Sequence, residues 1–239
     1  MSHLILVRHG QSEWNLENRF TGWVDVDLAP KGKFEACKAG ELIKEQKIEI
    51  DHFFTSYQKR AIETLKLILN TLRIKDNKIV RAWQLNERHY GSLTGLNKDE
   101  MKKKLGEKKV HAFRRSWNTP PAPLNKNNPY HPINIEAYKD VPPENIPDTE
   151  SLKDTYERVF PYFKKEILSK LENNKSILIS AHGNSLRAIC KYLIKLNEDK
   201  ITKIEIPTGN PLFISFNDKN EITKCHYLDK DRAKDLIAF

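Results

Sequence analysis

Residues 4–10 read LILVRHG, a short apolar run followed at once by Arg8, His9 and Gly10. Two later segments repeat the pattern. Residues 48–54 precede a turn that leads to Arg60, and residues 176–180 precede Ala181, His182, Gly183 and Asn184. Apolar residues at helical spacing follow the second and third runs, over 61–72 and 186–194. Short continuous apolar runs followed by helices are typical of buried parallel strands.

This order predicts an α/β fold, a three-layer sandwich with a mostly parallel central sheet flanked by helices. Runs at 211–216 and 222–228 are candidates for further strands, and residues 151–171 for a helix. In open parallel sheets, ligands bind beyond the carboxyl ends of the strands. The three polar turns are therefore expected to converge on one site.

We interpret residues 1–239 as one domain, because single α/β domains often exceed 200 residues. Between about 95 and 150 the pattern breaks down into a Pro-rich, irregular insertion that begins with a Lys-rich helix. Its aromatic residues favour a packed segment over a loose linker: Phe113, Trp117, Tyr130 and Tyr138. We expect this insertion to form part of the substrate site.

The composition excludes several classes of protein. No apolar run approaches the roughly 18 residues of a membrane-spanning helix. The first strand begins at residue 3, which leaves no room for a signal sequence, so a cytoplasmic protein is expected. The three cysteines, Cys37, Cys190 and Cys225, are widely spaced, which favours a reducing compartment over a disulfide framework.

The chain carries 41 Lys and Arg against 32 Asp and Glu, a net charge of +9. Such an excess favours an anionic partner of any size. The dense stretch 98–109 also contains acidic residues, and we interpret it mainly as a solvated helix face. Nucleic-acid binding needs a basic face with interleaved aromatics or a known motif, and the sequence has neither. Nucleic acid is therefore not expected as the main partner.

His9 is a candidate nucleophile for phosphorus. A neutral ring nitrogen attacks without losing a proton, and the phosphoramidate that forms is labile enough to pass the group on. Neighbouring arginines favour the neutral ring and bind an anionic substrate. By itself the tripeptide Arg8-His9-Gly10 is a weak signal, and a histidine packed at a strand end is the alternative.

A second histidine strengthens the case. His182 follows another buried strand and again precedes a glycine. Together with Arg8 and Arg60 it predicts a cationic pocket suited to a phosphoryl group. Paired histidines also suit a metal, but neither histidine has a partner at metal-motif spacing, so no metal is expected.

Phosphoryl transfer needs a proton donor for the leaving oxygen, and Glu87 is the candidate. Burial beside other anions would raise its pKa and let it work near neutrality. An ion pair between Glu87 and Arg88 is the competing interpretation. Similarly, Arg114 and Arg115 are either a substrate clamp or a surface pair.

Residues 6–15 (LVRHGQSEWN) resemble the signature of the histidine phosphatase superfamily. More narrowly, the chain resembles the cofactor-dependent phosphoglycerate mutases nearly end to end. The supporting segments are 18–28 (NRFTGWVDVDL), 54–64 (FTSYQKRAIET), 85–98 (LNERHYGSLTGLNK), 114–123 (RRSWNTPPAP), 149–155 (TESLKDT), 180–188 (SAHGNSLRA) and 206–212 (IPTGNPL).

The resemblance implies interconversion of 3-phosphoglycerate and 2-phosphoglycerate, with 2,3-bisphosphoglycerate as primer and bound intermediate and no metal. His9 would be phosphorylated, with Arg8, Arg60 and His182 around the phosphoryl group and Glu87 as general acid and base. The residues that would hold substrate phosphate or carboxylate are Ser12, Asn15, Thr21, Gly22, Tyr90, Lys98, Arg114, Arg115, Gly183 and Asn184. Members of the family are commonly homodimers or homotetramers, so a homo-oligomer is expected.

The sequence departs from the family at two places, and both bear on whether a lid closes over the site. Residues 117–118 are Trp-Asn where relatives often have Tyr-Asp, and the end at 232–239 (RAKDLIAF) lacks a longer Lys-rich tail. A plain phosphatase would use the same His9 and release phosphate to water. The insertion at 95–150 favours the mutase, because a mutase must exclude water from the phosphorylated enzyme.

Overall fold

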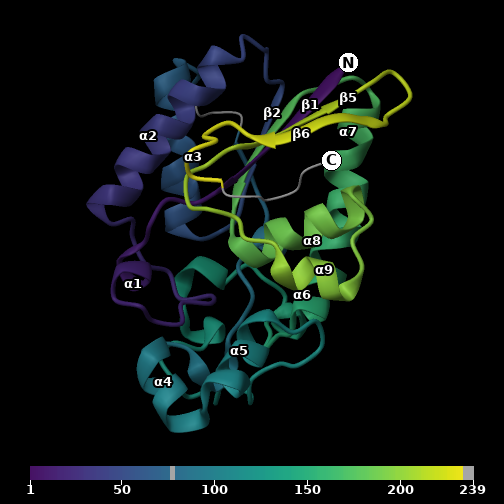
Figure 1. Cartoon of the computed structure of the whole chain (residues 1–239). Coiled ribbons are helices and arrows are strands. Elements are labelled where there is room, and N and C mark those ends of the chain that lie inside the picture. Colours follow the sequence, from purple (N-terminus) through teal and green to yellow (C-terminus); the bar gives the residue numbers. More distant parts are fainter. Residues whose placement is uncertain (76–78, 234–239) are drawn as a thin grey trace.

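The computed structural model describes residues 1–75 and 79–233 of the chain. Within these residues the strands are β1 (Ser2–Arg8), β2 (His52–Thr55), β3 (Ile79–Arg81), β4 (Ile177–Ala181), β5 (Leu212–Phe216) and β6 (Ile222–Tyr227). They form one sheet in the order β3-β2-β4-β1-β5-β6 (Figure 1). The first four strands are parallel, whereas β5 is antiparallel to β1 and β6 to β5. The expected mostly parallel sheet is confirmed.

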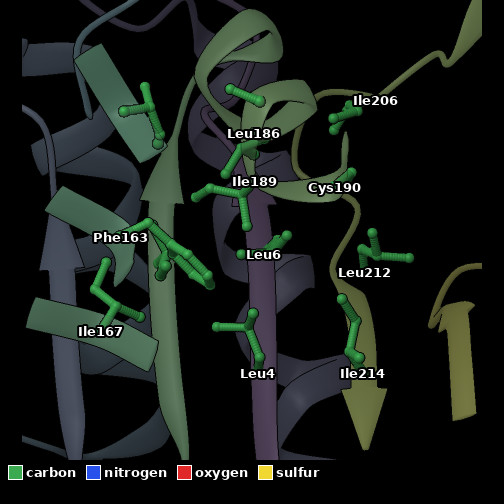
Figure 2. Close-up of a cluster of buried hydrophobic side chains, with 14 of the residues drawn as sticks. Leu4, Leu6, Phe163, Ile167, Leu186, Ile189, Cys190, Ile206, Leu212 and Ile214 are labelled. Atoms are coloured by element: carbon green, nitrogen blue, oxygen red, sulfur yellow. The ribbon is translucent and has the colours of Figure 1, made fainter. Parts of the chain in front are cut away.

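Helices cover both faces of this sheet (Figure 1). One face carries α2 (Pro30–Glu45) and α3 (Lys59–Leu72), and the other carries α6 (Leu152–Tyr162), the π-helical turn η7 (Phe163–Leu168), α7 (Ser169–Glu172) and α8 (Gly183–Leu193). Alternate residues of β1 pack into two cores. Leu4 and Leu6 join the cluster beneath α8 shown in Figure 2, and Ile5 and Val7 join the cluster beneath α2 and α3. The unbroken apolar run of β1 is thus buried on both faces.

The other predicted elements are largely confirmed. Both late strands are present, and the helix predicted over 151–171 is a continuous helical run that widens into η7 after Pro161, which has no N–H for a helical hydrogen bond. The second strand begins only at His52, because the apolar residues before it pack beside the core from a loop. Helix α2 is not predicted from the sequence, since its buried face consists mostly of small residues such as Ala36, Ala39 and Gly40.

The segment 95–150 holds short elements only: α4 (Lys98–Leu105), α5 (Glu107–Arg115), η4 (Pro132–Asn134), η5 (Glu136–Tyr138) and η6 (Pro143–Asn145). The Lys-rich helix ends at Gly106, whose φ of 87° belongs to the left-handed region that glycine favours. Of its aromatic residues, Tyr138 is buried and donates a hydrogen bond to the Trp23 carbonyl, while Phe113, Trp117 and Tyr130 are half-buried.

The remaining helices are α1 (Glu13–Leu16) and α9 (Glu198–Lys203), with 3-10 turns at η2 (Trp83–Leu85) and η3 (Gly91–Leu93). Over the described ranges, no helix combines the length and apolar character needed to cross a membrane. The departure from the family at the chain's end falls mostly at residues 234–239, which lie outside the described residues.

Candidate active site

Three strand ends meet at one edge of the sheet. Strands β2, β4 and β1 are parallel neighbours, so their carboxyl ends lie side by side. Ser56, His182 and His9 directly follow these strands. The ring centroids of His9 and His182 lie 5.0 Å apart. The expected convergence of distant turns is therefore present.

His9 is held in one tautomer. Its Nδ1 lies 2.7 Å from the carbonyl oxygen of Gly10, which can only accept, so Nδ1 carries the proton. The lone pair on Nε2 accepts from the Nε–H of Arg60 at 3.3 Å. Burial, and then the charges of Arg60 and Arg8, lower the pKa of His9 well below 6.5. His9 is thus neutral at pH 7, with a nucleophilic lone pair on Nε2.

Two arginines are fixed beside this nitrogen. Arg60 is 1% exposed, and its terminal nitrogens donate to the carbonyl oxygens of Val24 and Gly22, both at 2.9 Å. Arg8 donates from Nη1 to the carbonyl oxygen of Ile206 at 2.9 Å. Donors that are in place before the ligand arrives need no reorganisation to stabilise a phosphoryl group.

His182 precedes helix α8 and packs beside His9. Its Nε2 lies 2.7 Å from the hydroxyl of Ser56, which also accepts from the backbone N–H of Gln58 at 3.1 Å. Burial, followed by the positive charge of Arg60, lowers the pKa of His182 well below 6.5. When Ser56 donates to Nε2, the neutral ring carries its proton on Nδ1 and can donate it to an anion.

Glu87 accepts three hydrogen bonds at one carboxylate oxygen. The donors are the N–H of Arg88 at 2.8 Å, the N–H of Asn184 at 3.2 Å and the Nδ2 of Asn184 at 2.8 Å. Burial raises the pKa of this carboxyl, but these donors and the charges of Arg8 and Arg60 outweigh burial and lower the pKa overall.

The expectation of a raised pKa at Glu87 is therefore wrong for the protein without substrate. Its neighbours are N–H donors and cations, not the other anions that the expectation assumed. The competing interpretation, an ion pair with Arg88, also differs from what is found, because Nη2 of Arg88 donates to the carbonyl oxygen of Arg114 at 2.8 Å.

These groups open on a cationic cavity. In the described structure five cationic side chains and one carboxylate line it, a balance that suits a small molecule with several negative charges. Lys98 at the start of α4 and Arg114 near the end of α5 bring the insertion to the wall of this cavity. The lining residues are Arg8, His9, Asn15, Arg19, Thr21, Gly22, Arg60, Glu87, Tyr90, Lys98 and Arg114.

Two lining residues titrate just above neutrality. Burial, together with the charges of Arg114 and Arg8, lowers the pKa of Lys98 to about 8. Burial raises the pKa of Tyr90, but the charge of Arg88, its hydrogen bond to the phenol and the charge of Arg114 together outweigh burial and lower the pKa to about 8. The positive charge of this wall therefore falls as the pH rises above about 8.

Four of the predicted substrate-binding residues are not among those that line the cavity. Ser12 is fully buried, and its hydroxyl caps α1 by accepting from the N–H of Asn15 at 3.3 Å. Arg115 forms an ion pair with Glu205. Gly183 and Asn184 start α8, where the anion at the helix N-terminus is the carboxylate of Glu87 itself.

Three residues of the site are absent from the sequence predictions. Arg19 lines the cavity and stacks on Trp14, with its Cζ 3.9 Å from the ring centroid. Ser56 contacts His182, and Arg187 donates from Nη1 to Oδ1 of Asn184 at 3.2 Å. All three lie within segments that carry the family resemblance, which is the signal that identifies them.

Buried polar atoms without a protein partner gather around the cavity. Among the described residues these include Nε of Arg8 and Oγ1 of Thr21, which line the cavity, and Nδ1 of His182, whose ring packs beside His9. A buried polar atom left unpaired costs free energy until a ligand or water completes it. Each of these atoms can donate to a phosphoryl oxygen, so they fit an anion such as a bisphosphorylated substrate. Over the same residues, no group of three His, Cys, Asp or Glu side chains is arranged to hold a metal ion.

Solved structures with a similar fold include a mycobacterial glucosyl-3-phosphoglycerate phosphatase and the α-ribazole phosphatase of Shigella flexneri. The first has a TM-score of 0.70 at 19% identity, covering 95% of this chain and 97% of that one. The second has a TM-score of 0.68 at 19% identity, covering 99% and 100%. At this identity the likeness concerns the fold alone.

Sequence relatives are much closer. A model of the histidine phosphatase superfamily (branch 1) matches residues 4–129 and 124–226. The 2,3-bisphosphoglycerate-dependent phosphoglycerate mutase of Pelagibacter ubique is 70% identical over all 239 residues of both chains. The enzyme of that name from a Caulobacter species is 50% identical, covering 100% of this chain and 99% of its own. The chain therefore belongs to the histidine phosphatase superfamily and, within it, to the family of 2,3-bisphosphoglycerate-dependent phosphoglycerate mutases.

Proposed function

We propose that the protein interconverts 3-phosphoglycerate and 2-phosphoglycerate, a step of glycolysis and gluconeogenesis, primed by 2,3-bisphosphoglycerate. The observation that carries the proposal is the neutral His9, whose Nε2 lies in a cavity lined by five cationic side chains and by Glu87. The names of the close relatives support the same activity.

In the first transfer, phosphorylated His9 gives its phosphoryl group to the 2-hydroxyl of 3-phosphoglycerate. The N–P bond breaks as the new O–P bond forms, and the electron pair of the N–P bond returns to Nε2. Glu87 is ionised because its pKa is lowered, so it accepts the proton of the hydroxyl. Arg8, Arg60 and the Nδ1–H of His182 stabilise the negative charge on the phosphoryl oxygens.

In the second transfer, Nε2 of His9 attacks the phosphate at position 3 after the bound molecule has turned around. An N–P bond forms, the O–P bond breaks, and the leaving oxygen takes the proton from Glu87. The two phosphates bring negative charge close to Glu87, which raises its pKa and favours this donation. His9 is phosphorylated again and Glu87 is ionised again, so the cycle closes without a metal.

The test is a coupled assay of 2-phosphoglycerate formation, with and without 2,3-bisphosphoglycerate, in EDTA, beside the variant His9→Ala. Stimulation by the primer, indifference to EDTA and loss of activity in the variant support the proposal. Activity that ignores the primer and disappears in EDTA overturns it. Accumulation of free phosphate without isomerisation identifies a phosphatase that uses the same cavity.

We also propose that residues 1–239 form one domain whose segment 95–150 helps to exclude water, since Lys98 and Arg114 come from it. By resemblance to the family, we propose that the protein is a cytoplasmic homodimer or homotetramer. Light scattering coupled to gel filtration tests this, and a monomeric mass at micromolar concentration contradicts it.

A further inference from the structure

A buried ion pair lies outside the described lining of the cavity, next to the loop that carries Glu87. Arg158 belongs to α6 and Glu150 precedes it, and their side chains are 8% and 4% exposed. The Nε and Nη2 of Arg158 donate to the two carboxylate oxygens of Glu150 at 2.8 and 2.9 Å. This two-pronged contact fixes the plane of the guanidinium group and leaves donors for other partners.

Those donors go to the backbone around Glu87. Nη1 of Arg158 donates to the carbonyl oxygens of Gln84 at 2.8 Å and Asn86 at 3.2 Å, and Nη2 approaches that of Glu87 at 3.4 Å. On the other side of Glu87, the N–H of His89 donates to Oε2 of Glu150 at 2.8 Å. The pair thus contacts the main chain both before and after Glu87.

The loop needs such partners because the sheet does not supply them. After the N–H of Ala82 bonds the carbonyl oxygen of Thr55, the chain leaves β3 and makes the 3-10 turn η2 before Glu87. Buried backbone groups without partners are costly, so a loop at this depth requires donors from elsewhere. A paired Arg158 and Glu150 provide donors and an acceptor while adding little net charge near the cavity.

We propose that Glu150 and Arg158 are positioning residues that hold Glu87 in place for proton transfer, an inference that rests on the proposed function. Neither touches the substrate cavity. They act by fixing the backbone on both sides of one carboxylate. Residues 149–155 carry the family resemblance but supply no residue to the cavity lining. The proposal gives this segment a role, because Glu150 belongs to it.

The test compares two reactions of His9 that differ in their need for a proton. Transfer between the glycerate oxygens requires proton exchange with Glu87. Formation of phosphohistidine from p-nitrophenyl phosphate, measured as the burst of p-nitrophenolate before the phosphoenzyme reacts with water, forms the N–P bond as the O–P bond breaks and releases a phenolate that needs no proton. A change that displaces only Glu87 slows the first reaction and spares the second. A change that damages the cavity as a whole slows both.

The informative variants are Arg158→Lys, which keeps the charge but loses the planar fork, and the double variant Glu150→Leu with Arg158→Met. Replacing both members leaves no unpaired buried charge, so the double variant is expected to lose less stability than an apolar replacement of Arg158 or Glu150 alone. Glu87→Gln gives the reference loss of proton transfer. Glu157→Gln is the matched control, because it lies beside Arg158 on the same helix in an exposed pair with Lys153.

We expect the double variant to lower the mutase kcat about 10- to 100-fold, with KM and the rate of the p-nitrophenolate burst changed by less than about threefold. Arg158→Lys should keep a higher kcat than the double variant, because it keeps the positive charge beside Glu150. Glu157→Gln should behave as wild type. A folded double variant with normal kcat, or an equal loss of both reactions, overturns the proposal.

A second measurement does not depend on activity. A ¹³C NMR titration, with the Glu87 carboxyl signal assigned by its loss in Glu87→Gln, reports the pKa of this group. We expect the double variant to move that pKa upward, toward the ordinary value, because Glu87 loses its alignment with its donors. An unchanged pKa overturns the proposal. Absence of mutase activity in the wild-type protein would contradict the proposed function. The titration would then still test whether Glu150 and Arg158 position Glu87, because it does not depend on activity.

Discussion

The Nε of Arg60 lies 3.3 Å from Nε2 of His9, the nitrogen that we propose carries the phosphoryl group. The N–H of the guanidinium group points at the lone pair, and its positive charge opposes protonation of the ring. The cation that adds to the effect of burial in keeping the nucleophile neutral is therefore also in place to stabilise the phosphoryl oxygens that arrive beside it.

Replacing Arg60 with glutamine tests both effects. We expect Arg60→Gln to raise the pKa of His9 toward 6.5, because one of the two cations that lower it is removed. We expect the mutase kcat to fall about 100-fold, the typical loss of one preorganised donor. A ¹⁵N NMR titration of His9 and steady-state kinetics measure the two quantities. A pKa of His9 equal to that of the wild type would show that Arg60 does not contribute to keeping the ring neutral.

Stability should fall in acid because three buried histidines resist protonation. The pKa values of His9 and His182 are well below 6.5 and that of His89 is lowered to about 3, in each case mainly by burial. The unfolded chain binds these protons near pH 6.5 but the folded chain does not, so stability is lost as the pH falls below about 6.5. Each histidine contributes a slope of about 1.4 kcal/mol per pH unit within that window. Urea unfolding between pH 7 and pH 5 measures the slope, and a flat profile contradicts the prediction.

Ser56 is expected to fix the tautomer of His182. Its hydroxyl lies 2.7 Å from Nε2, so without it the proton is free to move to that nitrogen and Nδ1 loses its donor role. We expect Ser56→Ala to lower kcat about tenfold, the effect of one hydrogen bond, and to change the ¹⁵N shifts of the His182 ring. Ser180→Ala is the control, because that buried hydroxyl donates to the carbonyl oxygen of Ala61 instead. Equal effects of the two variants would mean that Ser56 acts through packing alone.

The sequence is sufficient to place the histidines, because apolar runs mark buried strands and the residue after each parallel strand lies at the same edge of the sheet. It does not predict the environment of Glu87. That carboxyl takes two of its three donors from Asn184, which is 97 positions away in the chain. The sequence shows the residue types, but only the folded chain shows that cations and N–H groups, rather than anions, surround Glu87.

The same limit applies to Arg115. The pair Arg114-Arg115 is compatible with a substrate clamp, yet only Arg114 lines the cavity. Both lie near the C-terminal end of α5, and Arg115 pairs with Glu205, a residue of a segment far away in sequence. Local spacing cannot reveal a partner of this kind.

The charge of Lys98 should make substrate binding sensitive to alkali. With a pKa of about 8, its ammonium group loses its proton as the pH rises above that value, and the attraction for an anionic substrate weakens. We expect kcat/KM to decline above pH 8 in the wild type. Lys98→Arg should flatten this decline, because arginine stays charged.

Tyr90 titrates in the same range, since its pKa is also about 8. Tyr90→Phe separates the two groups: it removes the phenol but leaves the ammonium group to titrate. If the alkaline decline disappears in Tyr90→Phe and persists in Lys98→Arg, the tyrosine rather than the lysine controls it.

Glu205 pairs with Arg115, which the family resemblance implies as a substrate-binding residue. Nη2 of Arg115 pairs with one carboxylate oxygen of Glu205, and Nη2 of Arg187 lies 3.8 Å from the other oxygen of the same carboxylate. If Arg115 binds substrate, as the family resemblance implies, it must first leave Glu205. The Glu205 side chain is 57% exposed, and such a pair is worth roughly 1 kcal/mol or less. Glu205→Gln should therefore lower KM for 3-phosphoglycerate about two- to fivefold.

The double variant Glu205→Gln with Arg115→Met should lose this gain, because no arginine remains to be released. Glu136→Gln is a suitable control, since it breaks an exposed pair with Lys139 that involves no residue of the cavity lining. A KM that is the same in wild type, Glu205→Gln and Arg115→Met would show that Arg115 stays with Glu205 during turnover. Arg114 would then be the member of the pair that contacts the substrate.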